Sequence, residues 1–139
     1  MAPAHPNGKT RYQMLAAGCL LVAIMSWAGC GRRAKMVEID KSYDGREVAL
    51  NIGDTAELSL GENPTTGYRW TFTSKPEPAC KVVNDSFDPG GSAPGAGGTH
   101  RWKLEAVSSG TGAVELQYRR PWEKNAAAGQ TFKLNIRVR

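Results

Sequence analysis

The chain has 139 residues, of which 40% are hydrophobic, and a formal net charge of +5, which suits one globular domain with a single core. Basic and acidic residues are mixed along it without a basic stripe, which argues against a nucleic-acid-binding surface. The sequence has neither paired catalytic carboxylates nor clustered His, Cys and Asp, so we expect no enzymatic activity, no metal site and no cofactor.

The first segment has the pattern of a signal peptide. Lys9 and Arg11 give it a basic start without any acidic residue, and residues 14–27 then run without a charge. Small residues follow directly before Cys30, as at the cleavage site of an exported protein. The uncharged segment is shorter than the roughly 20 residues that a membrane-spanning helix needs. We therefore predict that residues 1–29 are a signal peptide; the alternative is a buried helix.

Cys30 and the small residues before it resemble the bacterial lipobox, in which the cysteine is lipidated and becomes the first residue of the mature protein. The sequence departs from that pattern at Trp27, where lipoboxes usually carry leucine. Cys19 also follows small residues, but almost no apolar segment precedes it. The resemblance implies a lipid anchor at Cys30 and a short tether over residues 30–35. Because Gly31 and not aspartate follows the cysteine, we expect a cell-envelope protein on the periplasmic side of a bacterial outer membrane.

Residues 36–139 contain short apolar alternations with period two, the pattern of strands that bury one face. Gly, Pro, Asp and Ser separate them, and Gly53-Asp54 indicates a hairpin turn. No apolar helical periodicity persists beyond two turns. We therefore predict an all-β domain, an antiparallel β-sandwich of about seven or eight strands. The expected strands cover residues 36–40, 48–52, 55–60, 70–73, 81–84, 100–107, 114–118 and 132–138.

Cys80 and His100 are the two residues of this domain whose side chains could suggest catalysis. Cys80 is the only cysteine after residue 30, so the domain has no intrachain disulfide, and we expect it to be a small buried core thiol. His100 belongs to no catalytic or metal-binding motif and is interpreted as isolated. Residues 85–98, which are rich in glycine and proline, are expected to be irregular.

The segment from Gly61 to Trp70, G-E-N-P-T-T-G-Y-R-W, is expected to form a shaped loop between two strands. Pro64 has a fixed φ and favours extended backbone at Asn63, while Gly67 can adopt the positive φ that threonine avoids. A stiff loop with small hydroxyl side chains loses little entropy on binding, which favours recognition over catalysis. Taken alone, the segment is also typical of an ordinary connection between strands.

Two further motifs follow in the chain. Residues 95–98 have the sequence G-A-G-G, and residues 120–122 have the sequence R-P-W. N-P-T-T-G-Y, G-x-G-G and R-P-W in this order resemble the chagasin-type inhibitors of papain-like cysteine peptidases, from Val37 to the end of the chain. The resemblance implies an immunoglobulin-like sandwich, which agrees with the strand pattern. It also implies that the three motif loops form a wedge that enters the active-site cleft of the peptidase.

The resemblance assigns three groups of residues to peptidase binding. They are Asn63, Pro64, Thr65, Thr66, Gly67 and Tyr68 in the central loop, Gly95, Gly97 and Gly98 in the glycine loop, and Arg120, Pro121 and Trp122 in the third loop. Trp122 follows a proline and precedes polar residues, so we expect an exposed aromatic anchor, with a core tryptophan as the alternative. For the glycine motif alone, a disordered connection is the alternative.

Two classes of function stay open on the sequence. The first is a monomeric inhibitor of papain-like cysteine peptidases that binds reversibly and without a covalent bond, through three loops inserted into the active-site cleft. The second is an immunoglobulin-like module of the cell envelope that binds a partner or has a structural role, without inhibitory activity. Inhibition of papain by residues 31–139 would distinguish them.

Overall fold

The computed structural model describes residues 31–139, in which eight strands and two short 3-10 helices make up the regular structure. In chain order they are β1 Met36–Ile39, η1 Lys41–Tyr43, β2 Arg46–Leu50, β3 Thr55–Glu62, η2 Pro64–Thr66, β4 Arg69–Ser74, β5 Cys80–Pro89, β6 Gly98–Ala106, β7 Gly110–Arg119 and β8 Gln130–Val138. The predicted signal peptide and Cys30 lie outside the described residues. Within residues 31–139, no helix is long and apolar enough to cross a membrane.

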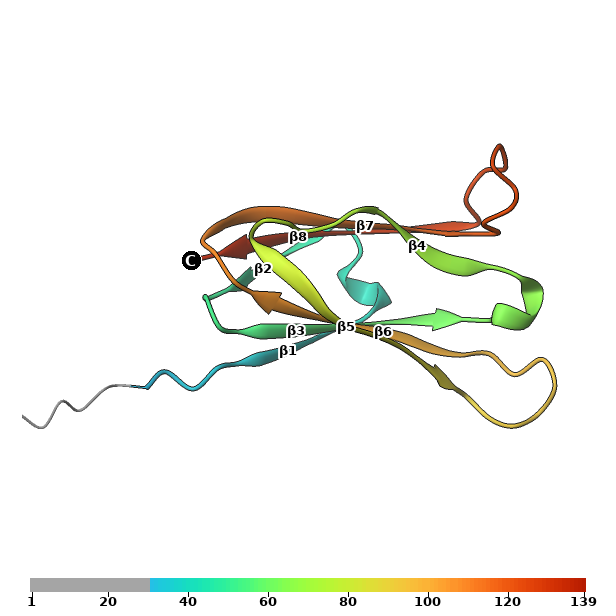
Figure 1. The fold of residues 1–139 in the computed structure, drawn as a ribbon, viewed down its shortest axis with the longest axis horizontal. Helices are drawn as coiled ribbons and strands as arrows, with labels where there is room; N and C mark the ends of the chain where they lie inside the picture. The colour runs from blue at the N-terminus through green and yellow to red at the C-terminus, as the bar shows by residue number, and fades with distance from the viewer. Residues whose placement is uncertain (1–30) are drawn as a thin grey trace, which may run out of the picture. The chain divides into compact units, whose positions relative to one another are not determined.

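The strands form two four-stranded sheets packed face to face, with the orders β1-β3-β6-β5 and β2-β8-β7-β4 (Figure 1). The predicted all-β sandwich is confirmed. Four of the six strand pairs are antiparallel, and two pairs at the sheet edges, β1 with β3 and β2 with β8, are parallel. The pair of β1 and β3 is parallel because the chain runs back through β2 in the other sheet. When it enters the first sheet again as β3, it runs in the same direction as β1.

The turn at Gly53-Asp54 does not form the predicted hairpin. The strands on either side, β2 and β3, belong to different sheets, so the turn joins the two layers of the sandwich. The Gly53 N–H donates to the carbonyl of Ala106, and the Asp54 carboxylate accepts from the backbone N–H groups of Lys35 and Asn51 at 2.9 Å each. Local alternation predicts where a strand ends, but it does not predict which strand becomes its partner.

The inward faces of the strands supply one core between the sheets. Its largest fully buried side chains include Ile39, Leu58, Trp102, Leu104, Leu116, Phe132, Leu134 and Ile136. Cys80 is also fully buried, which confirms the predicted core thiol, and burial raises the pKa of that thiol. Ile52 departs from the predicted alternation because it lies beyond the end of β2, and it is 57% exposed. Residues 32–139 form one compact unit that contains both sheets and this core, so they can fold as an independent domain.

Strand β5 is longer than its sequence predicts. The glycines and prolines indicate an irregular segment over residues 85–98, whereas β5 continues to Pro89 and only residues 90–97 form a loop. Pairing with β6 along this length supplies the backbone partners, and the Asp85 carboxylate accepts a hydrogen bond from the indole N–H of Trp102 at 3.1 Å. Tertiary pairing therefore overrides a weak local preference for strand.

Candidate functional site

Three loops lie at one end of the sandwich, on the right of Figure 1. The central loop, residues 63–68, joins β3 to β4; the glycine loop, residues 90–97, joins β5 to β6; and the third loop, residues 120–129, joins β7 to β8. They carry the N-P-T-T-G-Y, G-A-G-G and R-P-W motifs in that order, and only Gly98 of these motifs lies inside a strand, as the first residue of β6. Motifs that are far apart in the sequence thus become neighbours.

The central loop is fixed by its own hydrogen bonds. Its middle is the single turn η2, and the Asn63 side chain caps this turn by accepting from the Thr65 N–H at 3.2 Å and from the Thr65 hydroxyl at 2.6 Å. Gly67 ends the turn at φ +80°, and its N–H donates to the carbonyl of Pro64 at 3.0 Å. Thr65 and Thr66 are exposed at the tip. The result is a narrow, locally determined projection.

The third loop contacts the central loop through Arg120 and Trp122. The Arg120 Nε donates to the carbonyl of Thr66 at 3.1 Å, and its guanidinium carbon lies 4.8 Å from the centre of the Tyr68 ring. The indole of Trp122 lies against Gly67 so closely that a Cβ on this glycine would be 2.4 Å from the indole Cη2. Trp122 is 66% exposed, so the prediction of an exposed aromatic residue is confirmed and the core alternative is wrong.

The glycine loop contacts the other side of the central loop. The Asn63 side-chain amide donates to the carbonyl of Gly95 at 3.3 Å. A Cβ on Gly97 would lie 3.2 Å from the carbonyl of Glu62, so the two backbones approach more closely than a larger residue allows. Gly90 closes the loop by donating its N–H to the carbonyl of Gly97 at 2.8 Å. These contacts give the glycine loop a defined position beside the tip, in place of the disordered connection considered above.

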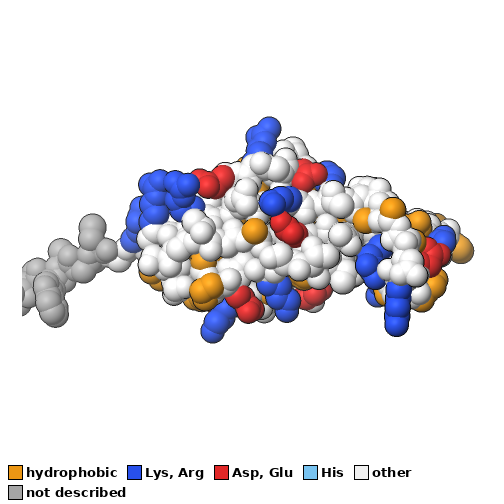
Figure 2. All heavy atoms as spheres, turned by 90° about the horizontal axis from the view of Figure 1, so that it is seen from above, with side chains coloured by type: hydrophobic (Ala, Val, Ile, Leu, Met, Phe, Trp, Pro, Cys, Tyr) orange, Lys and Arg blue, Asp and Glu red, His pale blue; other side chains and the backbone are white. Residues whose placement is uncertain are grey.

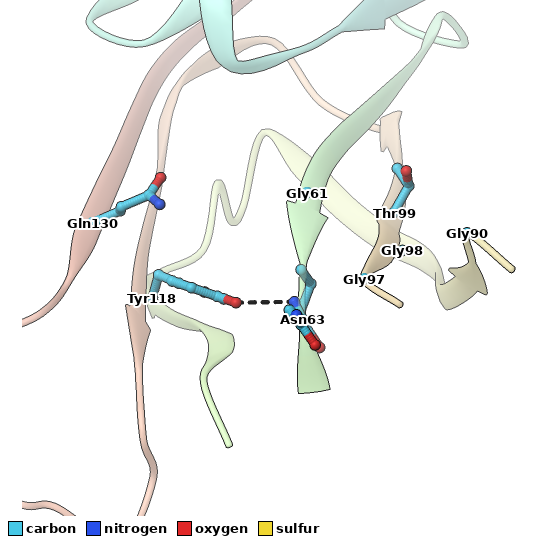
Figure 3. A pocket seen from close by; sticks show the side chains of 9 residues that line it. Gly61, Asn63, Gly90, Gly97, Gly98, Thr99, Tyr118 and Gln130 are labelled. Atoms are coloured by element: carbon cyan, nitrogen blue, oxygen red, sulfur yellow. Dashed lines mark hydrogen bonds between the residues drawn. The ribbon is translucent and has the colours of Figure 1, made fainter. Parts of the chain in front are cut away.

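Tyr118 of β7 holds the central loop in place through its hydroxyl group and its ring. Its hydroxyl accepts a hydrogen bond from the Asn63 N–H at 2.9 Å, drawn as a dashed line in Figure 3. Its ring packs against Tyr68 and Trp70, with centroid distances of 5.3 Å and 5.0 Å. Between Tyr118, Asn63 and the glycine loop lies an open hollow of about 490 Å³, which several glycines and the side chains of Tyr118 and Gln130 line (Figure 3). The end of the sandwich therefore presents a ridge of three loops beside an open hollow.

Residues 49–136 match the family described as "Chagasin family peptidase inhibitor I42". The chain belongs to the chagasin family. It is 31% identical over 106 residues to chagasin of Trypanosoma cruzi, a match that covers 73% of this chain and 96% of that protein. It is 37% identical over 104 residues to amoebiasin-1 of Entamoeba histolytica, covering 73% of this chain and 99% of the relative.

The fold agrees with this membership. The crystal structure of the cysteine protease inhibitor EhICP2 from Entamoeba histolytica superposes with a TM-score of 0.70 at 22% identity, covering 78% of this chain and all of that one. The expected immunoglobulin-like chagasin sandwich is thereby confirmed at the level of the fold. The matches cover 96% and 99% of the two relatives, so this domain spans nearly their whole length.

Beneath the loops of this family member lies a cluster that the sequence did not predict. His100, interpreted above as isolated, has its Nδ1 3.0 Å from the buried Glu62 carboxylate and its Nε2 2.6 Å from Asp85. Its ring stacks on Trp102 with a centroid distance of 4.0 Å. The Glu62 carboxylate also accepts from the backbone N–H of Trp70 at 3.1 Å. The cluster joins β3, β4, β5 and β6 at the stems of the loops, so it acts as a structural support.

This cluster does not form a metal site among residues 31–139. Within residues 31–139, no group of three or more His, Cys, Asp or Glu residues could hold a metal ion. The sequence offered weak signals for the supporting residues: Glu62 directly precedes the N-P-T-T-G-Y motif, and Tyr118 ends the predicted strand 114–118, two residues before R-P-W. Their positions beside the motifs suggested that Glu62 and Tyr118 lie close to the loops. Their contacts could not be predicted, because these depend on how the strands pair.

Proposed function

We propose that this protein is a reversible, non-covalent inhibitor of papain-like cysteine peptidases, which inserts the three loops into the active-site cleft. The observation that carries the proposal is the contact of both flanking motif loops with the central loop at one end of a chagasin-family domain. Relatives of the chain are inhibitors, and the motifs by which it resembles them are the residues that form this ridge.

The shape of the ridge suits insertion into a cleft. Its tip carries two threonines and a glycine, a set narrow enough to approach the floor of a groove, and the internal hydrogen bonds of the central loop limit the entropy lost on docking. Trp122 stands beside the tip as a rigid, exposed aromatic side chain, a residue type enriched among binding hot spots. The proposed contacts are the twelve residues of the three motifs named above.

The chemistry of the ridge favours inhibition without a covalent bond. The loops contain no electrophile, and the only cysteine among the described residues, Cys80, is buried at the far end of β5 with the pKa of its thiol raised. Inhibition then rests on shape and burial, and we infer that the protein has no enzymatic activity of its own. One domain supplies all three loops, so a monomer suffices.

The N-terminal sequence supports a second part of the proposal. Residues 1–29 would be removed as a signal peptide, Cys30 would carry lipid, and residues 30–35 would tether the domain to the periplasmic side of an outer membrane. Because the segment before β1 and the three loops lie at opposite ends of the domain (Figure 1), the anchor would present the loops away from the lipid. Incorporation of labelled fatty acid by the wild type but not by Cys30→Ala tests the anchor. Loss of labelling only in Cys19→Ala would assign the lipid anchor to Cys19 instead.

Titration of papain with residues 31–139 tests the inhibition. We expect residual activity to fall linearly to zero near one equivalent, with full recovery after dilution or displacement of the inhibitor. Papain that keeps full activity at a large excess of correctly folded protein would contradict the proposal and favour an envelope module without inhibitory activity. Circular dichroism of the same sample verifies the fold.

A further inference from the structure

The end of the domain opposite the three loops gathers segments from both ends of the described chain. The carbonyl of Lys35 accepts a hydrogen bond from the Thr55 N–H at 2.9 Å. Arg139 donates its N–H to the carbonyl of Leu50 at 3.0 Å, and its own carbonyl accepts from Ile52 at 3.1 Å. The segment before β1, the turn between β2 and β3, and the residue after β8 therefore lie together, at the left of Figure 1.

Basic side chains are concentrated here. Four of them, all exposed, define what we call the basic end: Arg32, Arg33, Lys35 and Arg139. Figure 2 shows Lys and Arg side chains gathered at this end of the domain. In the sequence the first three are separated from the fourth by the whole domain, so only the fold brings them together.

The acidic side chains near the basic end do not cancel this charge. Asp54 is 4% exposed, and its carboxylate is occupied by the backbone N–H groups of Lys35 and Asn51. Of the exposed acids nearby, Glu105 is the cross-strand partner of Lys81, which lies outside the basic end, and Glu38 lies three residues after Lys35 and offsets one of the four positive charges. The four basic residues thus give the surface a positive excess.

Two exposed apolar side chains lie among these charges. Of the four large hydrophobic residues exposed within residues 31–139, Met36 (49%) directly follows Lys35, and Ile52 (57%) lies in the turn bonded to Arg139. Apolar side chains bordered by Arg and Lys are the composition with which peripheral proteins contact a bilayer. The apolar groups enter the headgroup region, and the cations attract anionic lipid.

We infer that the basic end is a docking surface for the headgroups of an anionic phospholipid bilayer. Charge complementarity selects this occupant, and so does the direction of the chain, because residues 1–30, with the predicted lipidated Cys30, directly precede the surface. The inference goes beyond peptidase inhibition, and it concerns a surface that the inhibitory loops do not share. Its effect would be to hold the domain upright on the membrane with the three loops facing outward.

Flotation of residues 31–139, which carry no lipid, with vesicles tests the inference. We expect binding to vesicles of phosphatidylglycerol and phosphatidylcholine at least about tenfold stronger than to phosphatidylcholine alone, and loss of this preference in about 1 M salt. Replacing the four residues of the basic end by glutamine should remove the preference, and Ile52→Ser should weaken it. Papain inhibition by these variants should be unchanged, so a failure here is distinguishable from a failure of the proposed function.

A matched control neutralises four basic residues elsewhere, Arg46, Arg69, Lys124 and Lys133, and has the same net charge as the test variant. The control should bind the anionic vesicles at least about tenfold better than the test variant. Equal binding by the two variants would mean that net charge alone acts, and would overturn the inference. So would equal binding of the wild type to both kinds of vesicle, or self-association through this surface without vesicle binding.

Discussion

The indole of Trp122 occupies the space into which a side chain at Gly67 would project, with Cη2 2.4 Å and Cζ2 2.8 Å from an ideal Cβ on the glycine. Gly67→Ala should therefore displace the indole and also strain the backbone, since φ is +80° there and an L-residue loses roughly 1 kcal/mol or more in that region. We expect papain inhibition to weaken about tenfold or more. In a Trp122→Ala background the same change should cost less, and strictly additive effects in this double-mutant cycle would contradict the contact.

Trp122→Ala by itself should weaken papain binding by roughly 2 kcal/mol or more, as expected of an interface hot spot. Its melting temperature should stay close to that of the wild type, because the side chain is 66% exposed. Trp102→Ala serves as the control: this tryptophan is 1% exposed, so its removal should lower the melting temperature strongly. A comparable loss of stability in Trp122→Ala would instead assign Trp122 to the core.

Arg120→Lys keeps the charge but loses the geometry that joins two loops. Lysine has no planar group to lie over Tyr68 while donating to the carbonyl of Thr66. We expect papain inhibition to weaken by roughly fivefold to tenfold, with a small change in stability. The neighbouring Arg119→Lys should behave like the wild type. Equal inhibition constants for the two variants would show that Arg120 acts only through its charge.

The lowered pKa of Asp54 predicts how the free energy of unfolding depends on pH. Hydrogen bonds from the backbone N–H groups of Lys35 and Asn51, then from the Asn51 side chain, lower the pKa of Asp54 from 3.8 to about 2. A lowered pKa in the folded state means that the carboxylate contributes stability fully above pH 4 and loses it as the pH falls from 4 to 2. Denaturant unfolding of wild type and Asp54→Asn should therefore differ most at neutral pH and converge near pH 2. A gap that does not vary with pH would exclude this role.

Much of the fold is predictable from local alternation. Trp102 and Leu104, or Phe132 and Leu134, face the core because side chains of a strand alternate between its two faces, whatever its partners are. The partners themselves depend on contacts between distant residues. For that reason the turn at Gly53-Asp54 was predicted as a hairpin, although it joins two sheets.

The candidate site also combines features that the local sequence predicts with features that depend on distant residues. Pro64 and Gly67 predict a shaped central loop because each restricts or permits its own backbone angles. The contact of Trp122 with Gly67 and the pairing of His100 with Glu62 could not be predicted, since both depend on which loops and strands become neighbours. The basic end is a further case, because Arg139 joins Lys35 only in the folded domain.

The most direct test of the account is the affinity of residues 31–139 for papain whose catalytic cysteine is capped by a small methylthio group. A ridge that binds by shape needs no free thiol, so calorimetry should give a Kd within about tenfold of that for uncapped papain. The inhibitor should be recovered uncleaved. No detectable binding to the capped enzyme, or a chain cut between Thr65 and Tyr68, would contradict non-covalent insertion of the three loops.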